Sequence, residues 1–483
     1  MISKKPYLTF SVVFLLWIGK DESIYSLQKS MQLSNFYQQL FDSYSRYCES
    51  EIKYRRFKHK DLVVLLDKFE KNNILSNSIT GKSYQKRDIY LLKAGTGKIK
   101  ILLWSQMHGD EATATMALLD IFNFLTANDE LNAFREKILS ETTLYFVPML
   151  NPDGAEPFER RTAQCIDMNR DALQLQTPEA KLLKQLQHDL KPDFGFNLHD
   201  QNTHYTAGAT RNPATITFLA PPIDAQNTIN DVRKRAIQLI VQLNQHIQTF
   251  IPNQVGRWSD EYEPRAFGEN MQKWGTSTIL VESGGYPNDP EKQFIRKLNF
   301  IVLLDAFYQI ATQSYQNEKL EPYTAIPPNE KRLFDLLIKN VKVKDSIVDI
   351  GIIHNETTVG SSFYYNGQIY DWGDLSVFYG YEELDGQKLQ VKEGKLYPQK
   401  LSVIDDVARL PIAELLQQGY LAVQIDQITP EQRTTHTLPI HIISAKDDFS
   451  SKIGEGKEAN FFLTENGKIR YAVVNGFLHK VEP

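Results

Sequence analysis

The chain has 483 residues, of which 42% are hydrophobic and 23% are charged, and its formal net charge is −5. This length suits two or three domains, and the charge balance is that of a globular protein without the basic excess typical of nucleic-acid-binding proteins. Cys48 and Cys165 are the only cysteines, which excludes a disulfide framework and a thiolate metal cluster. A bound metal ion would therefore need His and carboxylate ligands.

The N-terminal segment has only part of the pattern of a targeting leader. Lys4 and Lys5 precede the apolar run Leu8–Ile18, which has the length of a signal peptide and is too short for a stable membrane span. No small-residue cleavage site follows this run, so export and a cytoplasmic location are equally supported. We assign residues 1–57 to this leader and a helical segment.

A strand-to-helix junction near residue 108 carries the first chemical signal. The apolar run Ile99–Trp104 predicts a buried strand, and Ala112–Leu125 has apolar residues at helical spacing. His108 and Glu111 lie in the turn between them, at the strand end where open α/β sheets place active sites. This pair suits Zn²⁺, although it fits equally well a turn cap and a charge that stabilises the helix.

Strands and helices then alternate along the chain. The remaining strands expected here are Asp88–Lys93, Thr142–Leu150, Phe194–Leu198 and Thr278–Val281. The remaining helices expected are Lys60–Phe69, Pro178–Leu190, Asp224–Phe250 and Glu291–Gln313. Residues 95–97 are expected to form a hairpin-like turn between two of the strands, and His199 and Glu282 directly follow two others. The alternation predicts an α/β fold with a mixed, mainly parallel sheet and helices on both faces.

The character of the sequence changes after about Tyr315. Proline residues mark a linker, and Asn329–Lys339 is expected to be a helix, so residues 316–345 form a connecting segment. Short alternating segments follow, and they predict a β-rich accessory domain over residues 346–483. Its expected strands include Ser362–Tyr365, Gln368–Trp372, Leu375–Tyr379, Ala459–Leu463 and Arg470–Val474.

The motifs, taken in order, resemble those of zinc carboxypeptidases of the carboxypeptidase A type. The resemblance runs from about Lys60 to Gln313. Its motifs are the opening hairpin Gly81–Tyr90, His108-Gly-Asp-Glu111, Asn151-Pro-Asp-Gly154, Asp167-Met-Asn169-Arg170, His199 and Glu282. It implies that residues 58–315 form the catalytic domain of a zinc metallocarboxypeptidase, which hydrolyses the C-terminal peptide bond or a related amide.

The resemblance also implies a metal centre and its catalytic groups. One Zn²⁺ per chain would be held by His108, Glu111 and His199, with water in the open position. Glu282 would be the general base that takes a proton from this water and later delivers one to the leaving amine. Arg160 would polarise the scissile carbonyl and stabilise the oxyanion.

Two further residues match the family's substrate-binding pair. Asn169 and Arg170 would hold the terminal carboxylate of the substrate, a task that suits the planar guanidinium. Tyr262 is the candidate for the family's mobile tyrosine, with Tyr286 and Tyr205 as alternatives. These residues would make the protein an exopeptidase.

Structural alternatives exist for the two arginines. Arg160 would instead pair on the surface with Glu156 or Glu159, and Arg170 would bridge structural carboxylates. The segment 262–268 is expected to contribute to the side-chain pocket, where Arg265 is a candidate for selecting an acidic side chain.

Two other functions compete with the peptidase. One is a zinc-dependent deacylase of N-acyl amino acids, resembling aspartoacylase and succinylglutamate desuccinylase, which share His-x-x-Glu and an Asn-Arg pair. Asn151-Pro-Asp-Gly154 and the complete opening hairpin favour the peptidase. The other is a non-catalytic binding module on this fold. This function would require the loss of a metal ligand or of the general base, and His108, Glu111, His199 and Glu282 are all present. The expected partner is a peptide or N-acyl amino acid, with no nucleic acid, and the sequence specifies no oligomeric state.

Overall fold

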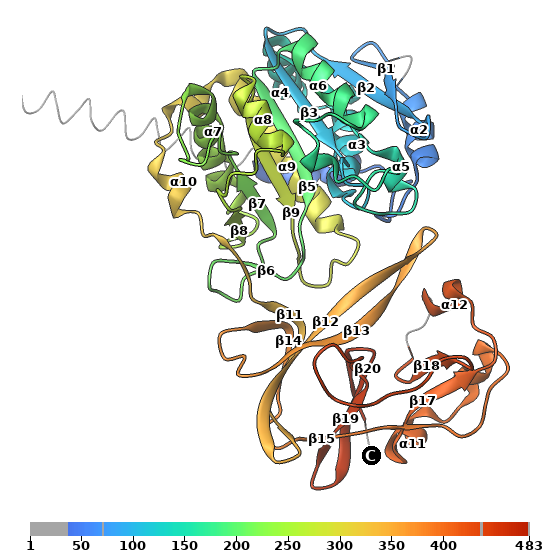
Figure 1. Ribbon diagram of the computed structural model, residues 1–483. Helices are drawn as coiled ribbons and strands as arrows, with labels where there is room; N and C mark the ends of the chain where they lie inside the picture. Colours follow the sequence, from blue (N-terminus) through green and yellow to red (C-terminus); the bar gives the residue numbers. More distant parts are fainter. Residues whose placement is uncertain (1–36, 70–71, 435–437, 482–483) are drawn as a thin grey trace, which may run out of the picture.

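The computed structural model describes residues 37–69, 72–434 and 438–481, which form an α/β part followed by a β-rich part (Figure 1). The apolar run Leu8–Ile18, predicted as part of a leader, lies outside the described residues. Within the described residues, no helix combines the length and the apolar character needed to cross a bilayer.

An eight-stranded sheet forms the centre of the α/β part, in the order β1-β2-β4-β3-β5-β9-β7-β8. Its strands are β1 (Leu75–Lys82), β2 (Asp88–Ala94), β3 (Ile99–Ser105), β4 (Thr142–Val147), β5 (Phe194–Asp200), β7 (Ile216–Leu219), β8 (Val255–Arg257) and β9 (Ser277–Ser283). The central strands β4, β3, β5 and β9 run parallel, whereas β2 pairs with β4 and β7 pairs with β9 in antiparallel fashion. The predicted mixed, mainly parallel sheet is confirmed.

Helices cover both faces of this sheet (Figure 1). One face carries α2 (His59–Asp67), α3 (Thr113–Thr126), α4 (Asn132–Glu141), α7 (Asp231–Ile247) and α9 (Gln293–Thr312). The other face carries α6 (Pro178–Leu190) and α8 (Phe267–Lys273). Side chains alternate along β3, so Ile101 and Leu103 pack in the first layer while Leu102 and Trp104 pack in the second. This double burial explains the continuous apolar run in the sequence.

Local signals placed several helix ends correctly. Helix α6 has the predicted bounds, because the Thr177 side chain accepts the backbone N–H of Ala180 at 3.2 Å and Pro178 takes the first position. Helix α7 begins at Asp231, later than predicted, because Asn230 caps it by accepting the N–H of Arg233 at 2.9 Å. Helices α4 and α8 and strands β7 and β8 were not predicted.

The predicted hairpin-like turn at residues 95–97 is wrong. Strand β4 lies between β2 and β3, so β2 and β3 do not pair as a hairpin and the chain between them crosses the end of β4. Gly95 has a φ of 79°, and a Cβ on Gly97 would lie 1.8 Å from the carbonyl carbon of Glu141. Glycine therefore permits this close crossing, which no local turn signal distinguishes from a hairpin.

The β-rich part contains a second eight-stranded sheet and a three-stranded sheet. The larger sheet has the order β13-β12-β11-β15-β19-β20-β21, with β14 also pairing with β11; the smaller has the order β16-β17-β18. The bounds are β11 (Leu333–Val343), β12 (Ser346–Val359), β13 (Ser362–Gly373), β14 (Tyr379–Asp385), β15 (Gln390–Lys392), β16 (Lys395–Leu396), β17 (Tyr420–Ile425), β18 (His441–Ser444), β19 (Phe461–Glu465), β20 (Lys468–Val474) and β21 (Phe477–Lys480). Short helices α10 (Glu321–Ala325), α11 (Ile412–Gln417) and α12 (Pro430–Thr434) accompany them. The predicted β-rich character is confirmed, and the domain boundaries stay predictions.

Two sequence predictions for this part are wrong. The helix predicted at 329–339 is instead β10 (Asn329–Lys331) and the start of β11. Phe334 and Leu337 pack in one core cluster while Leu336 and Ile338 pack in another, so this stretch is apolar on both faces and its periodicity resembles that of a helix. The strand predicted at 375–379 is a turn before β14, with the N–H of Phe378 bonded to the carbonyl of Leu375.

Contacts at two places, among others, join the α/β part to the β-rich part. Strand β10 pairs with β6 (Tyr205–Ala207), and the hairpin β12–β13 extends toward α5 (Pro152–Ala155) (Figure 1). On this hairpin, Glu356 accepts hydrogen bonds from Arg55 at 2.7 Å and from Arg56 at 2.5 Å. The Arg56 guanidinium lies between the rings of Phe158 and Phe363, at 4.4 Å and 4.2 Å from their centroids. We call these five residues the hairpin clamp.

Candidate functional site

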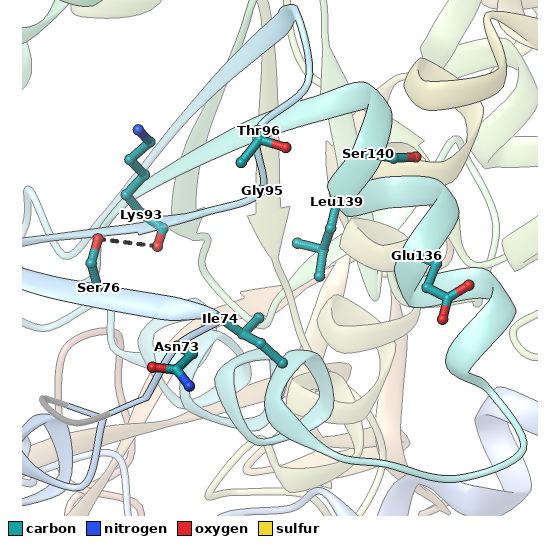
Figure 2. A pocket seen from close by; sticks show the side chains of 9 residues that line it. All are labelled: Asn73, Ile74, Ser76, Lys93, Gly95, Thr96, Glu136, Leu139 and Ser140. Carbon is teal, nitrogen blue, oxygen red and sulfur yellow. Dashed lines mark hydrogen bonds between the residues drawn. The ribbon is translucent and has the colours of Figure 1, made fainter.

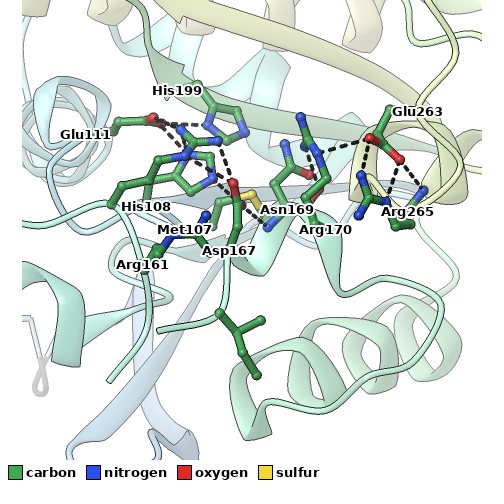
Figure 3. Close-up of polar contacts among 12 residues, drawn as sticks. Met107, His108, Glu111, Arg161, Asp167, Asn169, Arg170, His199, Glu263 and Arg265 are labelled. Carbon is green, nitrogen blue, oxygen red and sulfur yellow. Dashed lines mark hydrogen bonds and ion pairs between the residues drawn. The ribbon is translucent and has the colours of Figure 1, made fainter. Parts of the chain in front are cut away.

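Three candidate metal ligands lie together at the carboxyl edge of the central sheet (Figure 3). His108 and Glu111 occupy the turn between β3 and α3, and His199 lies in β5. Nδ1 of His108 is 2.8 Å from Oε1 of Glu111, and Nδ1 of His199 is 2.6 Å from Oε2 of the same carboxylate. Ligand atoms from all three residues lie within 4.8 Å of one another, and the three residues are buried.

Strand register brings these residues together. Strands β3 and β5 are parallel neighbours, so their carboxyl ends meet at one edge of the sheet, and His199 is in register with Glu282 of β9. The turn after β3 packs tightly on α5, because a Cβ on Gly109 would lie 2.0 Å from the carbonyl carbon of Gly154. The ionisable residues predicted at the ends of different strands therefore face one site.

Asp167 connects His108 to Arg160. Its Oδ1 is 3.1 Å from Nε2 of His108, and its Oδ2 accepts from Nε and Nη2 of Arg160 at 3.1 Å and 3.0 Å. Nη1 of Arg160 lies 3.0 Å from Nδ1 of His108 and 3.1 Å from Oε1 of Glu111. Because a carboxylate only accepts, Nε2 of His108 donates to Asp167, while Nδ1 faces both the guanidinium of Arg160 and the carboxylate of Glu111. Arg160 thus lies at the candidate metal site and does not form the alternative surface pairs.

The two carboxylates of this cluster are held in their ionised form. Burial alone would raise the pKa of Glu111, but the electrostatic interactions and hydrogen bonds with His108 and His199 outweigh it and hold the pKa below its usual range. Burial also acts to raise the pKa of Asp167, and the hydrogen bond from His108 together with the charge of Arg160 lowers it. Both groups therefore present negative charge to the site.

The donor set fits a zinc ion. Two imidazoles and one carboxylate are a common set for catalytic zinc. Burial lowers the pKa of His199, which favours its neutral, ligating form, and its buried Nε2 has no hydrogen-bond partner among the described residues. His108 gives its second ring nitrogen to Asp167, the kind of carboxylate contact that orients metal-bound imidazoles.

Glu282 is a buried carboxylate beside this donor set. It is 7% exposed, and its Oε2 has no hydrogen-bond partner in the described part of the chain. Burial, followed by the negative charge of Glu111, raises the pKa of Glu282 well above its usual range. Glu282 is therefore placed to exchange protons with a group at the metal site.

Asn169 and Arg170 form a second polar group close to the first (Figure 3). Oδ1 of Asn169 accepts the backbone N–H of Phe267 at 2.9 Å, which leaves the NH₂ group as its remaining hydrogen-bonding end. Arg170 pairs through Nε with Glu263 at 3.2 Å, and Glu263 also binds Arg265 at 2.8 Å. The predicted substrate-binding arginine is therefore also held by a structural carboxylate.

The structure separates the three candidate tyrosines. Tyr262 and Tyr205 both line the cavity at the site. The Tyr262 hydroxyl contacts Nζ of Lys273, whose ammonium lies 4.7 Å from the ring centroid. Tyr286 does not line this cavity and packs on Phe294, with ring centroids 4.4 Å apart.

One cavity of about 500 Å³ joins all the predicted site residues. Its lining includes His108, Glu111, Arg160, Asn169, Arg170, His199, Tyr262 and Glu282. Tyr262, Glu263, Ala266 and Gly268 of the segment 262–268 line this cavity, and Arg265 does not. The same lining includes residues that the sequence did not single out, among them Leu219, Pro221, Glu261, Glu269 and Leu280. A cavity of this size with converging polar groups is typical of a small-ligand site.

A second hollow lies between the first hairpin and α4, and it lacks this chemistry (Figure 2). Its lining holds one basic side chain, Lys93, and one acidic side chain, Glu136, which lie on opposite sides in the view. Its one marked hydrogen bond runs from Oγ of Ser76 to the Lys93 carbonyl at 3.4 Å. We assign the functional site to the first cavity.

Sequence reasoning missed the partners of the predicted residues. Asp167 was part of a motif but had no role, although metal-bound imidazoles usually donate their second nitrogen to a carboxylate. Glu263 and Glu269 carried no signal of their own, because their importance depends on which side chains pack beside them.

Comparisons with known proteins find similarity to carboxypeptidases. Residues 62–248 match the family model described as zinc carboxypeptidase. Probable carboxypeptidase 2 of Trichophyton verrucosum is 29% identical over 116 residues, which are 24% of this chain and 21% of that protein. Carboxypeptidase SOL1 of Arabidopsis thaliana is 29% identical over 103 residues, or 19% of this chain and 21% of that protein. The chain thus spans 21% of the length of these relatives.

Among solved structures, a metallo-carboxypeptidase from Burkholderia cenocepacia aligns with a TM-score of 0.44 and 14% identity, covering 54% of this chain and 70% of that one. Carboxypeptidase A from Helicoverpa armigera aligns with a TM-score of 0.42 and 14% identity, covering 60% and 82%.

Proposed function

We propose that this chain, whose residues 62–248 belong to the zinc carboxypeptidase family, is a zinc-dependent metallocarboxypeptidase that releases the C-terminal residue of a peptide or a related amide. One observation carries the proposal: the candidate metal ligands and the pair Asn169 and Arg170 line the same cavity. An exopeptidase needs both a centre that acts on an amide and a group that holds the neighbouring free carboxylate.

The metal would be held by His108, Glu111 and His199, one ion per chain. When bound, Zn²⁺ would supply a Lewis acid that acidifies water and polarises a carbonyl oxygen. Asp167 would keep the His108 ring in the orientation and tautomer that leave Nδ1 available as a ligand.

Glu282 would move the proton. Its Oε2 lies at the same sheet edge as His199 and has no partner among the described residues, so it can accept a proton there. Delivery of a proton from the same carboxyl group to the departing amine would complete hydrolysis of the amide. The buried surroundings of Glu282 keep bulk water away from this exchange.

Arg160 would stabilise negative charge on the carbonyl oxygen. Asp167 holds its guanidinium through Nε and Nη2, which leaves Nη1 directed at the ligand cluster. Loss of a donor that faces a developing oxyanion typically lowers the rate by about 10²–10³. The Arg160 side chain is 44% exposed, so it borders the cavity and remains accessible to a substrate.

Asn169 and Arg170 would bind the terminal carboxylate. The NH₂ group of Asn169 and the guanidinium of Arg170 both donate hydrogen bonds, and a carboxylate accepts from both. Tyr262 is the proposed residue that closes over the bound end, and Tyr205 lines the same cavity.

The test combines zinc content with hydrolysis of three substrate sets: blocked dipeptides with a free C-terminal carboxylate, the same peptides amidated at the C-terminus, and N-acyl amino acids. Wild type should contain about one zinc per chain and should cleave the free-acid peptides but not the amidated ones. Glu282→Gln should keep the zinc and lose the activity. Equal cleavage of amidated peptides would contradict recognition of the carboxylate, and zinc-free protein from a chelator-free purification would contradict the ligand set.

N-acyl amino acids are the competing substrates, because they also place an amide next to a free carboxylate. Faster turnover of these compounds than of the peptides would assign a deacylase. Zinc binding without turnover of any member of the panel would instead favour a binding module on this fold.

A further inference from the structure

The cavity has an apolar wall beside its polar groups. Leu219 of β7 and Leu280 of β9 are in register, and both line the cavity. Pro221 continues this wall and packs against Gly268 of α8, since a Cβ on Gly268 would lie 2.9 Å from the Pro221 ring. The next residue along α8 is Glu269, so the apolar wall ends at a carboxylate.

Glu269 is buried and forms no ion pair among the described residues. It is 7% exposed and lines the cavity, and its Oε1 accepts a long hydrogen bond of 3.4 Å from the backbone N–H of Glu263. The charge of Arg170 acts on it from beyond ion-pair distance. Among the described residues, no Lys, Arg or His nitrogen lies within 4.0 Å of its carboxylate. Burial raises the pKa of Glu269 to about 7. An unpaired carboxyl group in such a place is costly to ionise unless a ligand brings a cation.

The neighbouring acid is already neutralised. Glu263 pairs with Arg170 at 3.2 Å and with Arg265 at 2.8 Å and 2.9 Å. A cationic group that enters the cavity would therefore be able to form an ion pair with the carboxylate of Glu269.

We propose that Glu269 selects substrates whose C-terminal residue joins an alkyl stem to a cationic head, as lysine, arginine and ornithine do. The stem would cover the wall formed by Leu219 and Leu280, and the head would pair with the carboxylate. This inference rests on the exopeptidase function proposed above. It replaces the expectation that Arg265 selects an acidic side chain, because Arg265 does not line the cavity, is 56% exposed and holds Glu263.

The test uses blocked dipeptides that differ only in their last residue, with lysine compared against norleucine, which has the same stem without the charge. In wild type, kcat/KM for lysine should exceed that for norleucine by at least about 10-fold. In Glu269→Gln the ratio should fall to near unity, and Glu269→Lys should favour a C-terminal glutamate.

Glu179→Gln is the matched control. Glu179 is also a fully buried glutamate with a raised pKa, and it accepts the backbone N–H of Tyr84 at 2.9 Å, but it does not line the cavity. This control should keep the wild-type ratio of lysine to norleucine. A change in the ratio that is equal in both variants would overturn the proposal, because it would reflect altered packing.

The outcomes separate this inference from the proposed function. If wild type cleaves the norleucine peptide and shows no preference for lysine, the role of Glu269 is wrong and the exopeptidase stands. If Glu269→Gln retains the lysine preference, the role of Glu269 is again wrong. If zinc-loaded wild type cleaves no peptide of the series, both proposals fail.

Discussion

Replacing Glu356 with glutamine should loosen the contact between the β-rich part and the loop that leads to Arg160. Glu356 is the carboxylate of the hairpin clamp, and the side chains of Arg55 and Arg56 that it binds are only 8% and 2% exposed. Glutamine keeps the shape and one acceptor oxygen but removes the charge. Arg56 would then retain the hydroxyl of Thr358, at 3.2 Å, and its two aromatic neighbours.

The size of the effect follows from the burial of these groups. Removing one partner of a buried ion pair costs about 3–5 kcal/mol, because the other charge stays buried and unpaired. The Glu356 side chain is 26% exposed. Since glutamine also keeps an acceptor, we expect a loss of about 2 kcal/mol. This loss corresponds to about 30-fold faster hydrogen exchange of amides that the clamp protects.

Hydrogen exchange of two peptides measures the prediction: one from the β12–β13 hairpin and one from residues 156–162. Phe158, which stacks on Arg56, has a φ of 59° and lies in the second peptide, so both peptides should exchange faster. Glu465→Gln is the control, because Glu465 pairs with Arg470, whose side chain is 44% exposed, and such a pair contributes about 0–1 kcal/mol. Equal effects of the two substitutions, or faster exchange confined to the hairpin, would refute the coupling.

Three further predictions concern the site. Asp167→Asn should weaken zinc binding by about 10–100-fold, because His108 loses its orienting carboxylate; competition with a chelator of known affinity measures this. Arg170→Lys should lower kcat/KM for free-acid peptides by about 10-fold, because an ammonium cannot make the two-pronged contact, and a kcat/KM equal to that of wild type would contradict this prediction. Finally, the pKa of Glu269 in the folded protein, about 7, lies above the ordinary value of 4.5, so the folded state binds an extra proton between these values. Unfolding at about pH 5 and about pH 8 should therefore show that the stability of wild type relative to Glu269→Gln falls by about 2–3 kcal/mol as the pH rises, because the unfolded state loses its proton near pH 4.5 and the folded state keeps its proton up to about pH 7.

Much of the α/β part could be predicted from the sequence because its signals are local. The apolar run of β3 is continuous because both faces of the strand are buried. Helix α6 begins where it was predicted to begin because Thr177 caps it and Pro178 is its first residue. His108 and Glu111 belong to one turn, so their spacing alone indicates a pair of ligands. All the predicted site residues meet in one cavity, while their chemical roles stay predictions.

Some errors arose where local patterns are ambiguous. The stretch from Phe334 to Ile338 is apolar at nearly every position because a strand buried on both faces has no polar side, and this pattern does not differ from that of a buried helix. Gly95 and Gly97 correctly marked a sharp change in direction. They did not reveal that β4 would lie between the two strands that they connect.

By itself, the sequence determined many of the elements of the α/β part, the ligand types and their order along the chain, because these depend on residues a few positions apart. Only the tertiary structure decided that His199 lies in register with Glu282 and that Glu356 neutralises two arginines about three hundred residues away in sequence. It also decided that Glu269 forms no ion pair within the described part of the chain. The physical reason is that partner choice is set by packing and electrostatics between distant segments, whose free energies depend on burial and on which groups surround each charge.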